Sequence, residues 1–197
     1  MLSKIHPEKS RTQIFTVQVF TMIWLGMIIL SAMPFSFGAG ELVWFLLALA
    51  AAGCVLLCFL PIPRGRRFRK LLLAGGFALM TMLALHEAVE SVRRTMAGGG
   101  VLSALMTLFS LLLIVAGFGA SVGALQLPKV RMLKWSVFMA SLALAAQVMV
   151  GLIWYSGFYG ATEVNTANLM ELAEWVARML CCMGVFMYTM TPANEGK

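Results

Sequence analysis

Residues 71–90, LLLAGGFALMTMLALHEAVE, decide what kind of protein this sequence encodes. The first fifteen are apolar or small except for Thr81, and a histidine and two glutamates follow: His86, Glu87 and Glu90. A helix rises about 1.5 Å per residue, so twenty residues cross a hydrocarbon core about 30 Å thick. The segment therefore predicts a transmembrane helix with ionisable groups near one end.

The composition of the whole chain agrees with this prediction. Of 197 residues, 61% are hydrophobic and only 12% are charged, whereas a soluble domain carries about a quarter charged residues. Six segments are long enough to span a bilayer: residues 13–37, 41–61, 71–90, 101–125, 135–158 and 169–190. We predict an all-α, polytopic integral membrane protein with six transmembrane helices. The bundle would cover residues 13–191, between an N-terminal tail (1–12) and a C-terminal tail (192–197).

The positions of lysine and arginine predict the orientation, because cytoplasmic loops are rich in both. With the N-terminus inside, 12 of the 15 basic residues fall on the inner side, and only Arg93 and Arg94 fall outside. Both termini are therefore predicted to be cytoplasmic. The net charge of +7 is explained by this rule and by the anionic inner leaflet, so no nucleic-acid partner is expected. The absence of an N-x-[ST] sequon favours a bacterial inner (plasma) membrane.

The glutamates follow the opposite distribution. Six of the eight fall on or near the predicted outer side: Glu41, Glu87, Glu90, Glu163, Glu171 and Glu174. In the sixth segment, Glu171, Glu174 and Arg178 share one helix face because they are three and four residues apart. An arginine near a helix centre costs about 2.5–3.5 kcal/mol to insert. Arg178 should therefore face the bundle interior, near a carboxylate.

The two polar segments lie in the same layer, because the third helix ends and the sixth begins at the outer side. We therefore predict an ion-, proton- or ligand-binding site there, made of His86, Glu87, Glu90, Glu171, Glu174 and Arg178. The sequence does not say whether the two helices are neighbours. A purely structural network and two unrelated helix ends stay open as alternatives. Gln147, deep in the fifth segment, is expected to bond to a neighbouring helix.

The fourth segment contains AGFGASVGA, residues 116–124. Small residues at four-residue spacing let two helix backbones approach closely. The predicted packing interface consists of Ala116, Gly119, Ala120, Gly123 and Ala124. Packing within the bundle and association with a second copy or another protein are both compatible with this pattern.

Several kinds of chemistry are excluded by residues that the sequence lacks. There is no aspartate, and the chain has only two histidines, one of them His6 in the N-terminal tail. These absences exclude aspartate-based proteolysis and a haem with two histidine ligands from spanning helices. The four cysteines fall deep in the second and sixth segments and are interpreted as small hydrophobic residues. We predict no catalytic residue, metal or cofactor.

Two functions are compatible with these patterns. The first is a small membrane transporter or channel-type protein with an outward-facing acidic site for a cation, a protonated amine or a proton. The alternative is a non-catalytic structural or accessory subunit of a membrane complex, packing through the small-residue face of the fourth helix. Lipid is the expected surrounding, and a homo-oligomer or a partner in a membrane complex stays open.

Overall fold

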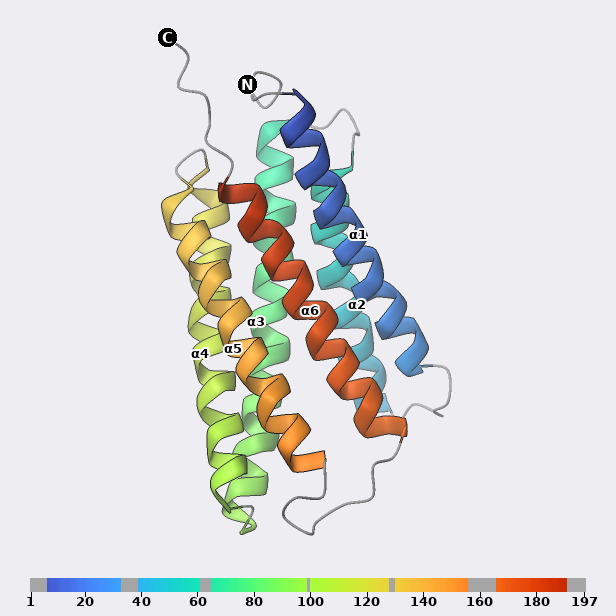
Figure 1. The fold of residues 1–197 in the computed structure, drawn as a ribbon, viewed down its shortest axis with the longest axis vertical. Coiled ribbons are helices and arrows are strands. Elements are labelled where there is room, and N and C mark those ends of the chain that lie inside the picture. Colours follow the sequence, from blue (N-terminus) through green and yellow to red (C-terminus); the bar gives the residue numbers. More distant parts are fainter. Residues whose placement is uncertain are drawn as a thin grey trace.

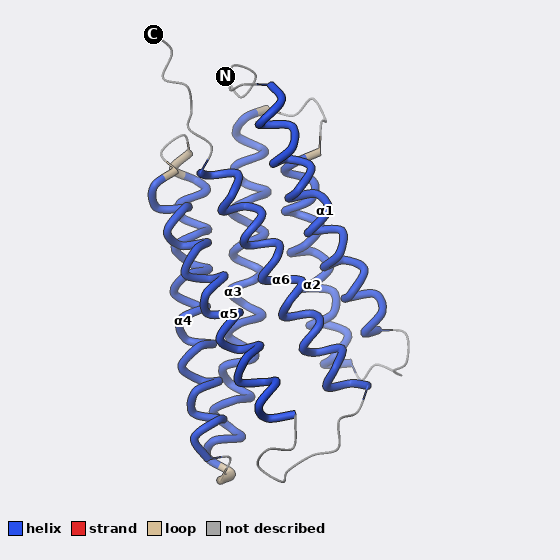
Figure 2. Tube along the Cα trace, in the orientation of Figure 1, coloured by secondary structure: helices blue, strands red, loops and turns tan. Residues whose placement is uncertain are grey.

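The computed structural model describes residues 7–32, 39–60, 65–98, 100–127, 130–155 and 166–190. These residues form six α-helices (Figures 1 and 2). The helices are α1 (Pro7–Ala32), α2 (Ala39–Phe59), α3 (Arg66–Met96), α4 (Gly100–Leu125), α5 (Arg131–Tyr155) and α6 (Thr166–Met190). Helices α1 to α5 are each long and apolar enough to cross a membrane. The prediction of an all-α, polytopic membrane protein is confirmed; α6, which carries three charged residues, is the sixth member of the bundle.

Some helices extend beyond the apolar segments that predicted them. Helix α1 begins at Pro7, inside the predicted tail, and α3 begins five residues before and ends six residues after residues 71–90. Hydropathy detects only the part of a helix that matches the hydrocarbon core. Arginine, lysine and methionine are good helix formers outside it, and proline is favoured at the first helical position.

The six helices form a closed ring. Each helix packs against the next one in the chain, and α6 packs against α1. Neighbours are antiparallel, so α1 begins and α6 ends at the same end of the bundle (Figure 1). We call the opposite end, which carries the α3–α4 turn, the outer end, following the predicted orientation. Among the described residues, α3 and α6 lie across the ring without backbone contact.

Small residues bring neighbouring helices of the ring together. A Cβ atom on Gly123 of α4 would lie 2.5 Å from the backbone nitrogen of Leu133 in α5. A Cβ atom on Gly119 would lie 2.5 Å from Oγ of Ser136, also in α5. Such close approach is what small residues permit between membrane helices. Helices α4 and α5 therefore pack with their backbones nearly touching.

The predicted packing interface of α4 is thus used inside the chain. Its five residues are all buried: Ala116, Gly119, Ala120, Gly123 and Ala124. The exposed side of α4 instead carries large apolar residues such as Val115 and Phe118, which suit contact with lipid. Any partner protein would have to use a surface other than the small-residue face.

The interior of the ring combines apolar packing with a few polar groups. Trp24, Val55 and Phe77 are at most 1% exposed. Among them lie buried polar side chains from four helices, namely Thr21, Ser110, Gln147 and Arg178. Polar groups inside a membrane protein are costly and usually have a functional or structural partner. This polar layer is the candidate functional site.

Candidate functional site

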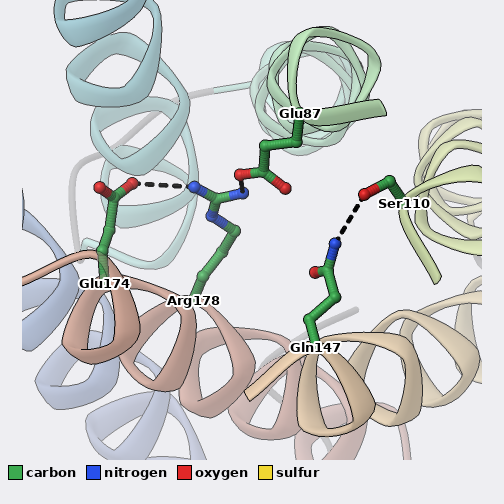
Figure 3. A network of polar contacts seen from close by, with 5 residues as sticks. All are labelled: Glu87, Ser110, Gln147, Glu174 and Arg178. Carbon is green, nitrogen blue, oxygen red and sulfur yellow. Dashed lines mark hydrogen bonds and ion pairs between the residues drawn. The ribbon is translucent and has the colours of Figure 1, made fainter. Parts of the chain in front are cut away.

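Arg178 lies at the centre of the polar layer. It is the middle residue of α6, twelve positions from each end, and its side chain is 4% exposed. Its guanidinium donates one hydrogen bond to Oε1 of Glu87 at 2.7 Å and another to Oε1 of Glu174 at 2.8 Å (Figure 3). Glu174 lies one turn along α6, whereas Glu87 comes from α3 on the other side of the ring. We call these three residues the ion triad.

The ion triad is not balanced in charge. Two ionised carboxylates share one guanidinium, which stays protonated in proteins, so the formal charge of the triad is −1. Glu87 and Glu174 are only 20% and 22% exposed. Burying an uncompensated charge is expensive. Binding one positive charge would therefore make the triad neutral.

An aromatic ring completes the surroundings of Arg178. The guanidinium carbon lies 5.9 Å from the ring centre of Trp24 in α1, and Trp24 is fully buried. A cation over an indole face is stabilised by the ring quadrupole. The sequence reasoning missed Trp24. The available signal was its position, about 12 Å from the end of α1 at 1.5 Å per residue, deeper than the interfacial belt where tryptophans gather.

A second polar contact joins α4 and α5. The amide nitrogen Nε2 of Gln147 donates to Oγ of Ser110 at 2.8 Å (Figure 3). Both residues are 0% exposed. The expectation that Gln147 bonds to a neighbouring helix is confirmed, and the structure identifies Ser110 as its partner.

Helix register places this second contact at the level of the ion triad. Gly117 of α4 faces Thr81 of α3. The two helices are antiparallel, so six residues towards the outer end lead from Thr81 to Glu87 on α3 and from Gly117 to position 111 on α4. Glu87 is therefore level with position 111, next to Ser110.

The register of α5 and α6 gives the same result. Gly151 of α5 faces Leu172 and Trp175 of α6. Four residues further from the outer end lead from Gly151 to Gln147 on α5, and from Leu172 and Trp175 to positions 176 and 179 on α6. Gln147 is therefore level with positions 176–179, which include Arg178. Glu87, Ser110, Gln147 and Arg178 therefore approach one level from four helices. At 1.5 Å per residue this level is about 12–18 Å from the outer helix ends.

Four buried atoms at this level have no hydrogen-bond partner among the described residues: Oε2 of Glu87, Oε1 of Gln147, Nε of Arg178 and Nε1 of Trp24. Buried polar atoms in proteins are nearly always hydrogen-bonded. The oxygen atoms of Glu87 and Gln147 are directed into the same interior space between α3 and α5 (Figure 3). The site thus combines an unbalanced charge with unused hydrogen-bonding capacity.

Two of the predicted site residues have neighbours outside the ion triad. The His86 ring stacks on Trp44 of α2, with ring centres 4.0 Å apart and planes at 12°. Glu90 accepts a hydrogen bond from Arg93 at 2.9 Å, on an exposed part of α3. Successive residues on a helix point about 100° apart, so His86 and Glu87 face different helices.

Glu171 belongs to a separate group nearer the outer end. It accepts a hydrogen bond of 2.6 Å from the hydroxyl of Tyr155 in α5. Arg94 of α3 lies within electrostatic reach of the same hydroxyl. The sequence reasoning missed Tyr155, because a tyrosine at a helix end is an ordinary interfacial residue.

A small cavity lies beside this group. Its volume is about 20 Å³, enough for about one water molecule. We call it the outer cavity. Its lining residues come from α3, α4, α5 and α6: Ser91, Arg94, Ser103, Met106, Gly151, Trp154, Tyr155 and Trp175. The outer cavity is therefore polar on several sides and lies between the level of the ion triad and the outer end.

The chemistry of the described residues is that of hydrogen bonds and ion pairs. Among the residues that the structure describes, no group of three or more His, Cys, Asp or Glu side chains could hold a metal ion. The four cysteines are free thiols, and Cys181 lies 3.4 Å from the hydroxyl of buried Thr21. This contact is consistent with packing of a small, soft side chain.

A closed ring of antiparallel apolar helices around a buried ion triad defines a polytopic integral membrane protein. No protein-family model, curated protein or solved structure matches the chain.

Proposed function

We propose that this protein is a small transporter or channel-type protein of a bacterial inner membrane. Its ion triad would bind a cation, a protonated amine or a proton that arrives from the outer side. The observation that carries the proposal is the sharing of one buried guanidinium by Glu87 and Glu174. A purely structural ion pair would be neutral, whereas this triad needs one further positive charge to become so.

The position of the polar groups supports access from outside. The outer cavity, with Tyr155 and Glu171 beside it, lies between the ion triad and the outer end. Towards the inner end, buried apolar side chains such as Val55, Phe77 and Leu133 pack inside the ring. A charged species meets polar groups from the outer end down to Arg178, and an apolar barrier below them.

The alternative function is an accessory subunit in which the ion triad serves only to hold the bundle together. One observation favours it: α3 and α6 have no backbone contact among the described residues, so the Glu87–Arg178 bond links two helices across the ring. An accessory subunit could not bind its partner through the small-residue face of α4, because α5 covers that face.

Flux measurements on the reconstituted protein separate the two functions. The full chain would be placed in liposomes, and gradients of protons, sodium, potassium and methylammonium would be imposed in turn. Glu87→Gln and Glu174→Gln remove a negative charge from the triad. Glu90→Gln is the matched control, since it makes the same change on α3 at an exposed pair with Arg93.

We expect the wild type and Glu90→Gln to carry the same flux. Glu87→Gln should reduce it about tenfold or more, because the group that takes up the positive charge is gone. Equal flux through Glu87→Gln and the wild type would refute the transport proposal. Absence of flux through the wild type in all four gradients, with the protein folded, would favour the accessory role.

A further inference from the structure

The buried atoms without hydrogen-bond partners indicate which positively charged species the ion triad binds. Oε2 of Glu87 and Oε1 of Gln147 are both hydrogen-bond acceptors, and both are buried without a donor among the described residues. They approach one level from α3 and α5 and point into the same space (Figure 3). Two such acceptors can be joined by a group that supplies hydrogen, or by a metal cation that both oxygens coordinate.

A proton satisfies this requirement with the least space. A protonated carboxyl group has one O–H donor, which can bond to the amide oxygen of Gln147. The outer cavity, which lies between this level and the outer end, has a volume of about 20 Å³. It holds about one water molecule and is too small for a hydrated metal ion or an organic amine to pass on the way to Glu87. Protonation also brings the formal charge of the ion triad from −1 to zero.

The charged surroundings of Glu87 single out this residue. Helix α4 carries no titratable side chain, and the only charged residue of α2 is Glu41 at its outer end. Across the ring, Glu87 therefore faces Arg178 and Glu174 of α6. Glu174 lies one helical turn from Arg178 and stays paired with it along α6. In the part of the chain that the structure describes, the second oxygen of Glu87 has no such partner.

We propose that Glu87 is a proton-binding carboxylate and that Gln147 is the positioning residue that holds its protonated form. A proton from water forms the O–H bond on Oε2, and this hydroxyl donates to Oε1 of Gln147, directly or through one water molecule. No electron moves, and Arg178 keeps its own protons and its bond to Glu174. This inference rests on the proposed function and specifies its substrate as the proton.

Ser110 can bond to Gln147 in either of two orientations of the amide. In the structure, Nε2 of Gln147 donates to the Ser110 oxygen, which leaves Oε1 free to accept from protonated Glu87. A half-turn of the amide would direct Nε2 to ionised Glu87, and Ser110 would then donate to Oε1, because a hydroxyl is both donor and acceptor. The pair can thus serve both charge states of the carboxyl group.

Infrared spectroscopy of the full chain in detergent tests the inference directly. The carbonyl stretch of a protonated carboxylic acid is separate from the bands of carboxylates and amides. Because the chain has eight glutamates, the Glu87 band is the part of the low-pH signal that the wild type and Glu90→Gln share and that Glu87→Gln lacks. Gln147→Leu should keep the band but shift it to higher frequency, because the hydroxyl loses its acceptor.

The inference is overturned if no band depends on Glu87 at any pH at which the protein is folded. It is also overturned if Gln147→Leu leaves the frequency unchanged, a comparison that stays decisive should Glu87→Gln fail to fold. The flux assay separates this result from the broader proposal. Flux of sodium, potassium or methylammonium without a Glu87 band would refute the proton site alone. A Glu87 band in a protein without flux would refute transport and leave the proton site standing.

Discussion

Replacing Gly123 with alanine tests how closely α4 and α5 are packed. The added Cβ atom would lie 2.5 Å from the backbone nitrogen of Leu133, 2.8 Å from its Cα and 3.1 Å from its Cβ. Two of these three atoms belong to the backbone, so rotation of a side chain cannot relieve the clash. The helices must separate near the inner end of α4, and the packing of α4 on α5 there is lost.

The expected loss of unfolding free energy can be compared with that of two control variants, Gly119→Ala and Gly75→Ala. Overpacking a well-packed interior costs about 1–3 kcal/mol, and alanine regains about 0.5–1 kcal/mol over glycine in a helix. We expect Gly123→Ala to lose about 1–2 kcal/mol net by these two principles. Gly119→Ala should lose less, because its Cβ meets the movable hydroxyl of Ser136. Gly75→Ala should be neutral or stabilising, since no described atom of a neighbouring helix lies within 4 Å of its Cβ position.

The assay is unfolding of the purified protein in mixed micelles with increasing denaturing detergent, followed by tryptophan fluorescence. The predicted order of stability is Gly75→Ala, then Gly119→Ala, then Gly123→Ala. If Gly123→Ala were as stable as Gly75→Ala, the close α4–α5 packing would be wrong. The small-residue face would then be free for another protein.

Three further predictions concern the residues around the site. His86→Phe should preserve the stack on Trp44 and change the unfolding free energy by less than about 0.5 kcal/mol, whereas His86→Ala should lower it by about 0.5–1.5 kcal/mol. Equal losses from both variants would argue against stacking. Arg93→Gln should change the unfolding free energy by less than about 0.5 kcal/mol, because its pair with Glu90 is exposed, and a larger loss would indicate a buried role. Cys181, which is fully buried, should react with a maleimide only after unfolding; rapid labelling of the folded protein would contradict the packing of α6 against α1.

Much of the fold could be predicted because hydropathy and helix length are local properties of the chain. The predicted ends at Leu125 and Met190 coincide with the ends of α4 and α6. The charged ends of α3 were missed, since a helix can continue beyond the hydrocarbon core without leaving a hydropathy signal. The inward position of Arg178 could also be predicted, because a lipid-facing guanidinium is too costly.

The composition of the site could be predicted only in part. Glu87, Glu174 and Arg178 lie together, as expected for a shared layer, but His86 and Glu90 point elsewhere. The separation depends on a rotation of about 100° between successive helix residues and on which helix stands opposite each one. Sequence periodicity gives the rotation along one helix, while the order of helices around the ring comes from tertiary packing.

The most direct test of the account is the coupling free energy between Glu87 and Arg178. It is obtained by comparing the unfolding free energies of Glu87→Gln, Arg178→Met, the double variant and the wild type. A buried hydrogen bond between charged groups predicts a coupling of about 1.5–3 kcal/mol. The same cycle for Glu90 and Arg178 should give a coupling within about 0.5 kcal/mol of zero. A coupling free energy between Glu87 and Arg178 as small as that of the control pair would contradict the hydrogen-bonded ion pair across the ring.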